Sequence, residues 1–242
     1  MKATLSDQRA ILDIQNLDFA HATLTNKAAN LPEIAAINSL TIRSHNARDL
    51  RIAAETESSD VKRELARAEG DVEQIVARIN RDEARLASGT GAPKELEQLQ
   101  HELASLAGRR AELEEIELEI MMRIDGIKAR ISELSEQERV LGNEITELEI
   151  KKANALAVIN ADLDATVADR ASVVSSVNPE LLALYEKIRQ ANNGTGAAAL
   201  VDNQCKGCNL AINTIELQRI DSLPEDEVVR CEECRCILVR GL

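Results

Sequence analysis

The segment Ser88-Gly89-Thr90-Gly91-Ala92-Pro93 is the clearest helix-breaking cluster in the first half of this 242-residue chain. Its two glycines disfavour a helix, and its proline suits the first turn of a new one. The segments on either side have nearly equal lengths, about 83 residues from Leu5 to Ala87 and about 80 from Lys94 to Val173. A break so near the midpoint of a long helical region indicates two arms joined by a short turn.

Both arms carry aliphatic residues at alternating spacings of four and three, which is the heptad pattern of a coiled coil. The pattern covers residues 61–86 in the first arm and residues 96–148 in the second. One step in the second arm, Ile116 to Ile120 to Ile124, repeats a spacing of four. Such a stutter is expected to relax the supercoil locally.

The composition also favours long helices over an ordinary globular core. Phe19 and Tyr185 are the only aromatic residues, and charged residues make up 29% of the chain. Coiled coils bury narrow seams of aliphatic side chains and need no bulky core. We therefore predict an all-α fold in which residues 1–175 form a long antiparallel coiled-coil hairpin with its tip near residues 88–93. A parallel homodimer, in which each arm pairs with its copy, is the alternative.

Two features interrupt the first arm. Leu31-Pro32 is expected to end or kink the helix, because proline disfavours helical geometry in the residue before it. Between Arg43 and Asp60, the seam weakens to alanines and polar residues. This stretch is either loosely packed or functional, as a flexible joint or as a place where a partner helix docks.

Two shorter segments follow the second arm. Asn178-Pro179 is a cap-and-proline start for a short helix, Leu181 to Arg189. Residues 192–196, Asn-Asn-Gly-Thr-Gly, then predict a flexible linker. We assign residues 176–197 to this helix and linker, and residues 198–242 to a small domain of short strands and one short helix.

Four cysteines in the C-terminal domain have the spacing of a zinc ribbon. They form Cys205-Lys-Gly-Cys208 and Cys231-Glu-Glu-Cys234, with 22 residues between the pairs. Each pair forms a tight knuckle that directs two thiolates at one point, and two knuckles complete a tetrahedron around Zn²⁺. Because no position is left open for water, one zinc ion bound here is expected to be structural.

The main alternative for these cysteines is a pair of disulfide bonds. The segment Met1 to Leu12 contains no apolar run of signal-peptide length, and no stretch of the chain approaches the roughly 20 apolar residues that span a membrane. We therefore expect a cytoplasmic protein without membrane association. In that compartment thiols stay reduced, and paired C-x-x-C motifs bind metal.

Cys236 is a fifth cysteine, two residues after the second pair. We expect it to be a small apolar residue on a strand beside the site, since free cysteine commonly behaves as a small hydrophobe. Two other roles stay open. In the first, Cys236 exchanges with Cys234 as a zinc ligand. In the second, Cys236 is a spare thiol that is sensitive to oxidation.

The charge balance disfavours a broad nucleic-acid interface. The net charge is −13, and residues 198–242 contain five Lys or Arg against eight Asp or Glu. Non-specific nucleic-acid binding draws most of its affinity from basic side chains that neutralise phosphates, and aromatic stacking platforms are also missing. Nucleic-acid binding by a local patch is the competing functional hypothesis. Its candidate residues are Lys206, Arg219, Arg230, Arg235 and Arg240.

An enzyme is the least favoured class of protein. His21, His45 and His101 are far apart on the helical arms, and none is next to a plausible nucleophile. The leading hypothesis is a protein-binding adaptor, either a monomer or a weak homodimer. Its candidate docking regions are the weak seam and the tip, with tip residues Pro93, Lys94, Glu95 and Leu96. A purely structural spacer is the third hypothesis.

Over essentially its full length, the chain resembles the bacterial coiled-coil zinc-ribbon family of C4-type zinc-ribbon proteins. The resemblance is carried by Leu31–Glu33, Pro93–Leu103, Asn178–Arg189, the two cysteine pairs, and Cys231–Leu238. It implies a helical hairpin with a terminal zinc ribbon, no enzymatic activity, and zinc ligands at Cys205, Cys208, Cys231 and Cys234. Relatives look like adaptors or chaperones that engage transcription, flagellar or secretion components, and some are linked to RNA binding.

The chain departs from the family pattern at one place. The family has glycine and arginine after the last ligand, whereas this chain has Arg235 and Cys236. Any contact that the basic residue makes in relatives is therefore expected to be shifted or lost here.

Overall fold

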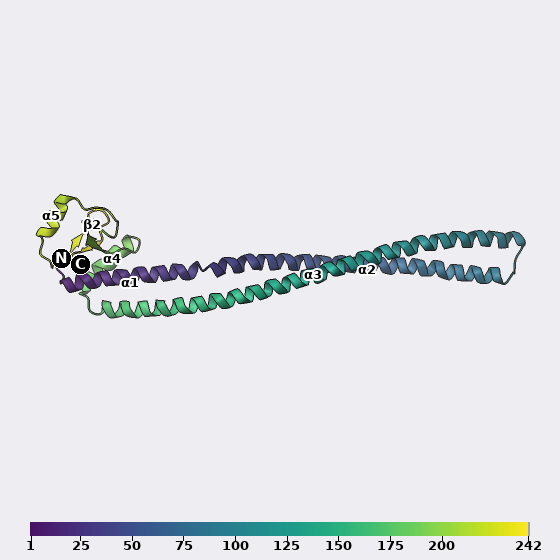
Figure 1. Cartoon of the computed structure of the whole chain (residues 1–242), viewed down its shortest axis with the longest axis horizontal. Coiled ribbons are helices and arrows are strands. Elements are labelled where there is room, and N and C mark those ends of the chain that lie inside the picture. Colours follow the sequence, from purple (N-terminus) through teal and green to yellow (C-terminus); the bar gives the residue numbers. More distant parts are fainter. Residues whose placement is uncertain (242) are drawn as a thin grey trace. The chain divides into compact units, whose positions relative to one another are not determined.

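The structure is a computed structural model and describes residues 1–241. It is mainly helical, with a small C-terminal region of short strands and one helix (Figure 1). The elements are α1 (Leu5–Ala29), α2 (Pro32–Ala87), α3 (Pro93–Val174), α4 (Pro179–Ala191), β1 (Ala197–Val201), β2 (Gln204–Cys205), α5 (Thr214–Ser222), β3 (Val229–Arg230) and β4 (Ile237–Val239). The chain divides into two compact units, Met1–Ile34 with Ile150–Leu242, and Ala35–Glu149.

The predicted coiled-coil hairpin is confirmed. α2 ends at Ala87 and α3 begins at Pro93, so that residues 88–92 make the turn. Gly89 adopts a φ of 63°, a left-handed conformation that glycine takes without steric cost. Within the Ala35–Glu149 unit, ion pairs join the two helices of the same chain, as between Arg123 Nη1 and Glu64 Oε2 at 3.1 Å.

The seam of α3 follows the heptad without interruption, which corrects the predicted stutter. Ile120 and Ile124 are buried, as expected, but Ile116 is 43% exposed. Glu117 is half-buried instead, three residues before Ile120 and four residues after the buried Leu113. Ile116 was predicted to lie in the seam because it is aliphatic. The phase of the helix, set by its buried neighbours, places the adjacent glutamate in the seam.

Small and polar residues fill the seam of α2 between residues 43 and 60. Ala47 and Ala54 are buried, and Arg51 Nε donates to Glu138 Oε1 of α3 at 2.6 Å. Both side chains of this ion pair are mostly buried. This part of the stretch therefore contacts α3 directly. A charged pair held at the seam also favours one register between two helices, because any slip would leave both charges unpaired.

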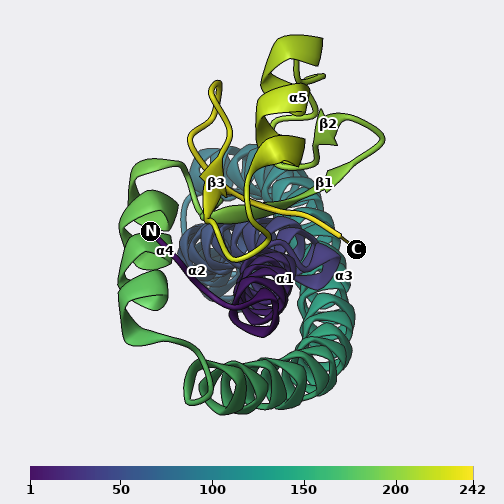
Figure 2. The ribbon, with the colours of Figure 1, turned by 90° about the vertical axis from the view of Figure 1, so that its left-hand side faces the viewer.

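In the other unit, the short strands pack against α1 and α4 (Figure 2). The Asn178 side chain caps the first turn of α4 as predicted, and the helix begins at Pro179, two residues before the predicted Leu181. The buried core joins Ile11 and Ile14 of α1 to Tyr185 of α4 and Ile237 of β4. The strands therefore share one apolar core with the two helices.

Residues 192–196 were predicted to be a flexible linker, and the structure differs. Gln15 Oε1 accepts from the backbone N–H of Gly196 at 2.6 Å and of Ala197 at 3.2 Å, and Gln15 Nε2 donates to Gly194 O at 3.0 Å. A Cβ added to Gly196 would lie 2.6 Å from the ring of Tyr185. This glycine therefore permits a close approach of backbone to an aromatic ring, and the segment is held in place.

A charged cluster links α1 to α3 and α4. Asp18 accepts from Arg170 Nε at 2.6 Å and from the Tyr185 hydroxyl at 2.6 Å, and Arg189 Nε lies 3.4 Å from Asp18 Oδ2. Burial alone would raise the pKa of Asp18. The hydrogen bonds from Arg170 and Tyr185, with the charges of Arg170 and Arg189, hold it below the usual aspartate value.

Acidification is expected to weaken this cluster through Asp18. Because the pKa is lowered on folding, the stabilisation is fully present above the unfolded value of about 3.9 and is lost as pH falls through the lower folded value. At neutral pH, Asp18→Asn should reduce the free energy of unfolding by about 1–3 kcal/mol. Thermal unfolding at neutral pH and near pH 2 checks this expectation, since the difference between the two proteins should shrink in acid. A difference that stays constant would contradict it.

Candidate metal centre

Both cysteine pairs are carried by a four-stranded sheet of order β2-β1-β4-β3. β1 runs parallel to β4, and the other neighbours are antiparallel. Cys205 ends β2, and Cys231 directly follows β3. The knuckles share one hydrogen-bond pattern, because the N–H of Asn209 donates to Cys205 O at 2.7 Å and the N–H of Arg235 donates to Cys231 O at 3.0 Å. Each turn thereby directs its two cysteines to the same side.

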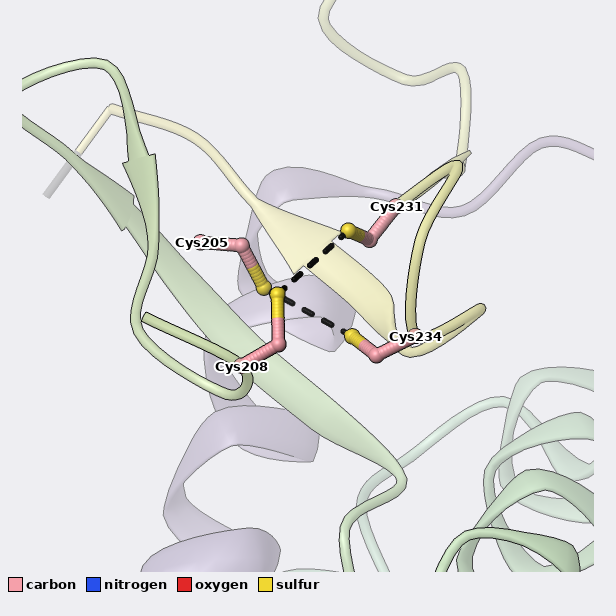
Figure 3. A group of neighbouring side chains, drawn as sticks. All are labelled: Cys205, Cys208, Cys231 and Cys234. Atoms are coloured by element: carbon pink, nitrogen blue, oxygen red, sulfur yellow. Dashed lines mark hydrogen bonds between the residues drawn. The ribbon is translucent and has the colours of Figure 1, made fainter. Parts of the chain in front are cut away.

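The four sulfur atoms converge between the knuckles (Figure 3). All lie within 4.8 Å of one another. Cys205 Sγ is 3.8 Å from Cys234 Sγ, and Cys208 Sγ is 3.9 Å from Cys231 Sγ. A tetrahedral site with Zn–S bonds of about 2.3 Å has sulfur–sulfur edges of about 3.8 Å. The four cysteines lie close enough to hold a metal ion, and the number, type and spacing of the donors fit Zn²⁺.

Burial and hydrogen bonding set the acidity of these thiols. Cys205 and Cys231 are buried, whereas Cys208 and Cys234 are partly exposed. Burial raises the pKa of Cys231 to about 12. Burial would also raise the pKa of Cys234, but hydrogen bonds from the backbone of Cys236 and from neighbouring thiols lower it. A metal ion binds thiolates, so binding here releases protons.

The helical part of the chain matches a known domain. Residues 14–193, well over half of the chain, match the CT398-like coiled coil hairpin domain. The chain belongs to this family. The four cysteines lie outside the matched residues, so the zinc-ribbon part of the resemblance rests on their own geometry.

The similarity to known proteins extends over nearly the whole length of both chains. An uncharacterized protein of Mycobacterium tuberculosis is 33% identical over 240 residues, which cover 99% of this chain and 98% of that protein. A solved structure from Mycobacterium smegmatis has a TM-score of 0.88 at 32% identity and covers 100% of both chains. The structure of CT398 from Chlamydia trachomatis, with a TM-score of 0.71 at 21% identity over 96% of both chains, shares the fold.

In this CT398-like hairpin protein, two of the five candidate nucleic-acid contacts are engaged within the fold. Arg219 Nε donates to Glu216 Oε2 at 2.7 Å. The guanidinium of Arg240 donates to backbone carbonyls, including Ile220 O at 2.6 Å at the end of α5 and Glu227 O at 3.1 Å. Arg240 is therefore engaged within the fold, whereas the Arg219 side chain is paired with Glu216 but is still 53% exposed.

The other three candidate residues are exposed, and the structure shows single hydrogen bonds for Lys206 and Arg230. Lys206 Nζ donates to Gln204 Oε1 at 3.2 Å, and Arg230 Nε donates to the backbone carbonyl of Arg235 at 3.0 Å. The side chains of Lys206, Arg230 and Arg235 are exposed. Together with the exposed but ion-paired Arg219, they are the basic side chains of the candidate patch that are accessible to a phosphate.

The tip residues lie at the start of α3. Pro93, Lys94 and Glu95 are exposed, and Leu96 is half-buried. The carboxylate of Glu95 accepts from the backbone N–H of Ala92 at 3.3 Å, so this side chain helps to cap α3. Within residues 1–241, no helix is long and apolar enough to cross a membrane.

Replacing Arg240 with alanine is expected to destabilise the C-terminal region by about 2 kcal/mol, because several backbone carbonyls lose a charged donor. Arg240→Lys should recover little of this loss, since a single ammonium group lacks the planar fork that reaches carbonyls on both sides. Amide hydrogen exchange in residues 214–228 checks this, with the exposed Lys206→Ala as the control. Unchanged exchange in Arg240→Ala would show that the contacts to Ile220 and Glu227 are dispensable.

Sequence reasoning missed the contacts that the N-terminus makes with this region. The N–H of Ala3 donates to Asp226 O at 2.8 Å, and the N–H of Val228 donates to Met1 O at 3.0 Å. Gln8 Nε2 also donates to Glu225 O at 2.9 Å. These partners are more than 200 positions apart in the sequence. No local pattern signals such a contact.

Proposed function

We propose that this protein is a non-enzymatic coiled-coil adaptor that docks a protein partner, and that one structural Zn²⁺ stabilises its C-terminal region. The family assignment supports the first part, because the matched domain is a coiled-coil hairpin. The four convergent thiols support the second part.

The observation that carries the docking role is an apolar groove in the Ala35–Glu149 unit. Its volume is about 420 Å³. Its walls are Arg43, Asn46, Ala47 and Leu50 of α2, and Glu136, Gln137, Val140, Leu141 and Glu144 of α3. Leu50 is 48% exposed and Val140 is 41% exposed. Ala47 contributes only a methyl group at its seam position, which leaves space beside it that a larger residue would fill.

An amphipathic helix from a partner protein suits this groove. Both walls are α-helices whose backbone groups are already hydrogen-bonded, so a partner is held by side chains alone. Apolar side chains of such a helix would cover Leu50 and Val140, and charged side chains would pair with Arg43 and Glu144 at the rim. The groove falls within the weak seam that the sequence singled out. The tip offers less apolar surface, because Leu96 is already half-buried.

The basic residues of the C-terminal region give less support to nucleic-acid binding. Arg240 is engaged with backbone carbonyls, and the exposed Arg219 is already paired with Glu216, which neutralises part of the candidate patch. The net charge of −13 opposes phosphate binding elsewhere. A component of the transcription or secretion machinery, the class that the family resemblance implies, is the first partner to test.

The experiment is affinity capture from a lysate of the native host, with zinc-loaded protein and with or without nuclease. Wild type is compared with Val140→Glu, which places a charge in the groove, and with Leu118→Glu as the matched control. Leu118 is 60% exposed on the same helix and is not part of the groove. We expect a protein partner that survives nuclease, is retained by Leu118→Glu, and is lost with Val140→Glu.

Other outcomes reject the proposal in distinguishable ways. Partners that disappear with nuclease, together with recovered RNA or DNA, would transfer the function to the basic residues beside the cysteines. Partners that bind Val140→Glu as well as wild type would exclude the groove. A lysate that yields no partner under any condition would favour the structural spacer.

A further inference from the structure

Cys236 lies against the thiol cluster and contacts both knuckles. Its side chain is fully buried, and its sulfur is 3.2 Å from Cys234 Sγ and 3.6 Å from Cys205 Sγ. A Cβ added to Gly207, in the first knuckle, would lie 3.3 Å from the same sulfur. The glycine of the first knuckle thus makes room for a fifth sulfur beside the four that converge.

The knuckle fold itself does not require a cysteine at this position. The N–H of Cys205 donates to Leu210 O at 3.0 Å, and the N–H of Cys231 donates to Cys236 O at 3.0 Å. Leu210 and Cys236 therefore hold equivalent places in the two knuckles. Leu210 is 50% exposed and has no ligand atom, whereas Cys236 is buried with its sulfur among the thiols.

Cys234, whose sulfur lies 3.2 Å from that of Cys236, is one of the two partly exposed candidate ligands. Cys234 and Cys208 are partly exposed, whereas Cys205 and Cys231 are buried. Accessible thiolates are the ones that electrophiles and oxidants reach first. Cys234 has a buried, unassigned thiol within 3.2 Å, whereas the sulfur 3.9 Å from Cys208 belongs to Cys231, another candidate ligand.

We propose that Cys236 is a reserve zinc ligand that replaces Cys234 when Cys234 is chemically blocked or absent. This inference rests on the zinc centre proposed above. In the exchange, the bond from Zn²⁺ to the Cys234 sulfur is replaced by a bond to the Cys236 sulfur. The Cys236 thiol gives its proton to solvent, and no electrons are transferred. The ion keeps four thiolates, three of them unchanged.

The test compares full-length serine variants by zinc stoichiometry and by competition with a chromogenic chelator. Cys236→Ser should bind one zinc as wild type does, and Cys234→Ser should also retain one zinc, with affinity reduced about tenfold. Cys208→Ser, the matched control at the other partly exposed ligand, and the double variant C234S/C236S should lose on the order of a hundredfold or more. X-ray absorption at the zinc edge should count four sulfur neighbours in Cys234→Ser and three in Cys208→Ser.

A second measurement needs no substitution of Cys234. Limiting iodoacetamide is followed by mass mapping and a zinc-sensitive dye. In wild type, alkylation of Cys234 should not release zinc, whereas alkylation of Cys208, the other partly exposed ligand, should release it. In Cys236→Ser, alkylation of Cys234 should also release zinc.

Two results separate the failures of the two proposals. If wild type binds no zinc, both the zinc centre and the reserve ligand are rejected. If wild type binds zinc but Cys234→Ser is as weak as C234S/C236S, or if zinc leaves wild type in step with Cys234 alkylation, the reserve ligand alone is rejected.

Discussion

Removing the proposed zinc ion by chelation, or replacing Cys231 with serine, is expected to unfold residues 197–240 and leave the helices of the Ala35–Glu149 unit intact. The strands of this region are two to five residues long. One face of the sheet packs on α1 and α4 through Ala197 and Ile237. The separate core around the cysteines is small, built on residues such as Ala198, Ile220 and Leu238. Structural zinc sites contribute about 10–16 kcal/mol at neutral pH, more than so small a core supplies alone.

Amide hydrogen exchange measures this directly, because protection in residues 197–240 should collapse when zinc is removed. Lys206→Ala, at an exposed position in the first knuckle, is the control and should keep both zinc and protection. Acid should have the same effect as chelation, since protonated thiols do not bind zinc. Protection that survives complete chelation would show that the apolar core, and not the metal, holds this region.

Tyr185→Ala is expected to cost about 3–5 kcal/mol of stability in the unit that contains α1 and α4. Tyr185 is fully buried and belongs to the core shared by α1, α4 and β4. Its removal leaves a cavity beside Gly196 and deprives Asp18 of a donor. Tyr185→Phe keeps the ring and should cost only about 1–3 kcal/mol, the value of one hydrogen bond to a charged group.

Chemical denaturation followed by circular dichroism, with amide exchange in α1 and α4, separates these cases. The matched control is Phe19→Ala, which removes the other aromatic residue of the chain. Phe19 is 71% exposed, so its loss should change stability by less than about 0.5 kcal/mol. If Tyr185→Phe were as damaging as Tyr185→Ala, the hydrogen bond to Asp18 and not the ring would dominate.

Several features of this fold were readable from short windows of sequence. The glycines and proline of residues 88–93 end α2 and start α3. The cap-and-proline pair Asn178-Pro179 starts α4. The spacing within each cysteine pair predicted a shared focus, and the sulfurs converge. These signals are legible because caps, breakers and knuckles act within a few residues.

The heptad phase of α3 was harder to predict from the sequence, because an isoleucine, Ile116, stands next to the residue that occupies the seam, Glu117. Ile116 is more hydrophobic than Glu117, yet Ile116 is exposed and Glu117, at the heptad position set by its neighbours, is half-buried. Burial along a helix is decided jointly by every residue that shares its face, so one polar residue is carried into the seam by its neighbours.

By itself, the sequence determined the coiled-coil hairpin, the break at Leu31-Pro32 and the convergence of four cysteines, because each depends on local spacing and backbone preference. Only the tertiary structure decided that Gln15 holds residues 194–197, that Arg240 is engaged with backbone carbonyls, and that Cys236 lies against Cys234 and Cys205. The composition of a segment does not predict which distant residues its polar groups hydrogen-bond to. Those partners are brought together only when distant segments pack, because every buried donor and acceptor must then be satisfied by whichever group lies nearest.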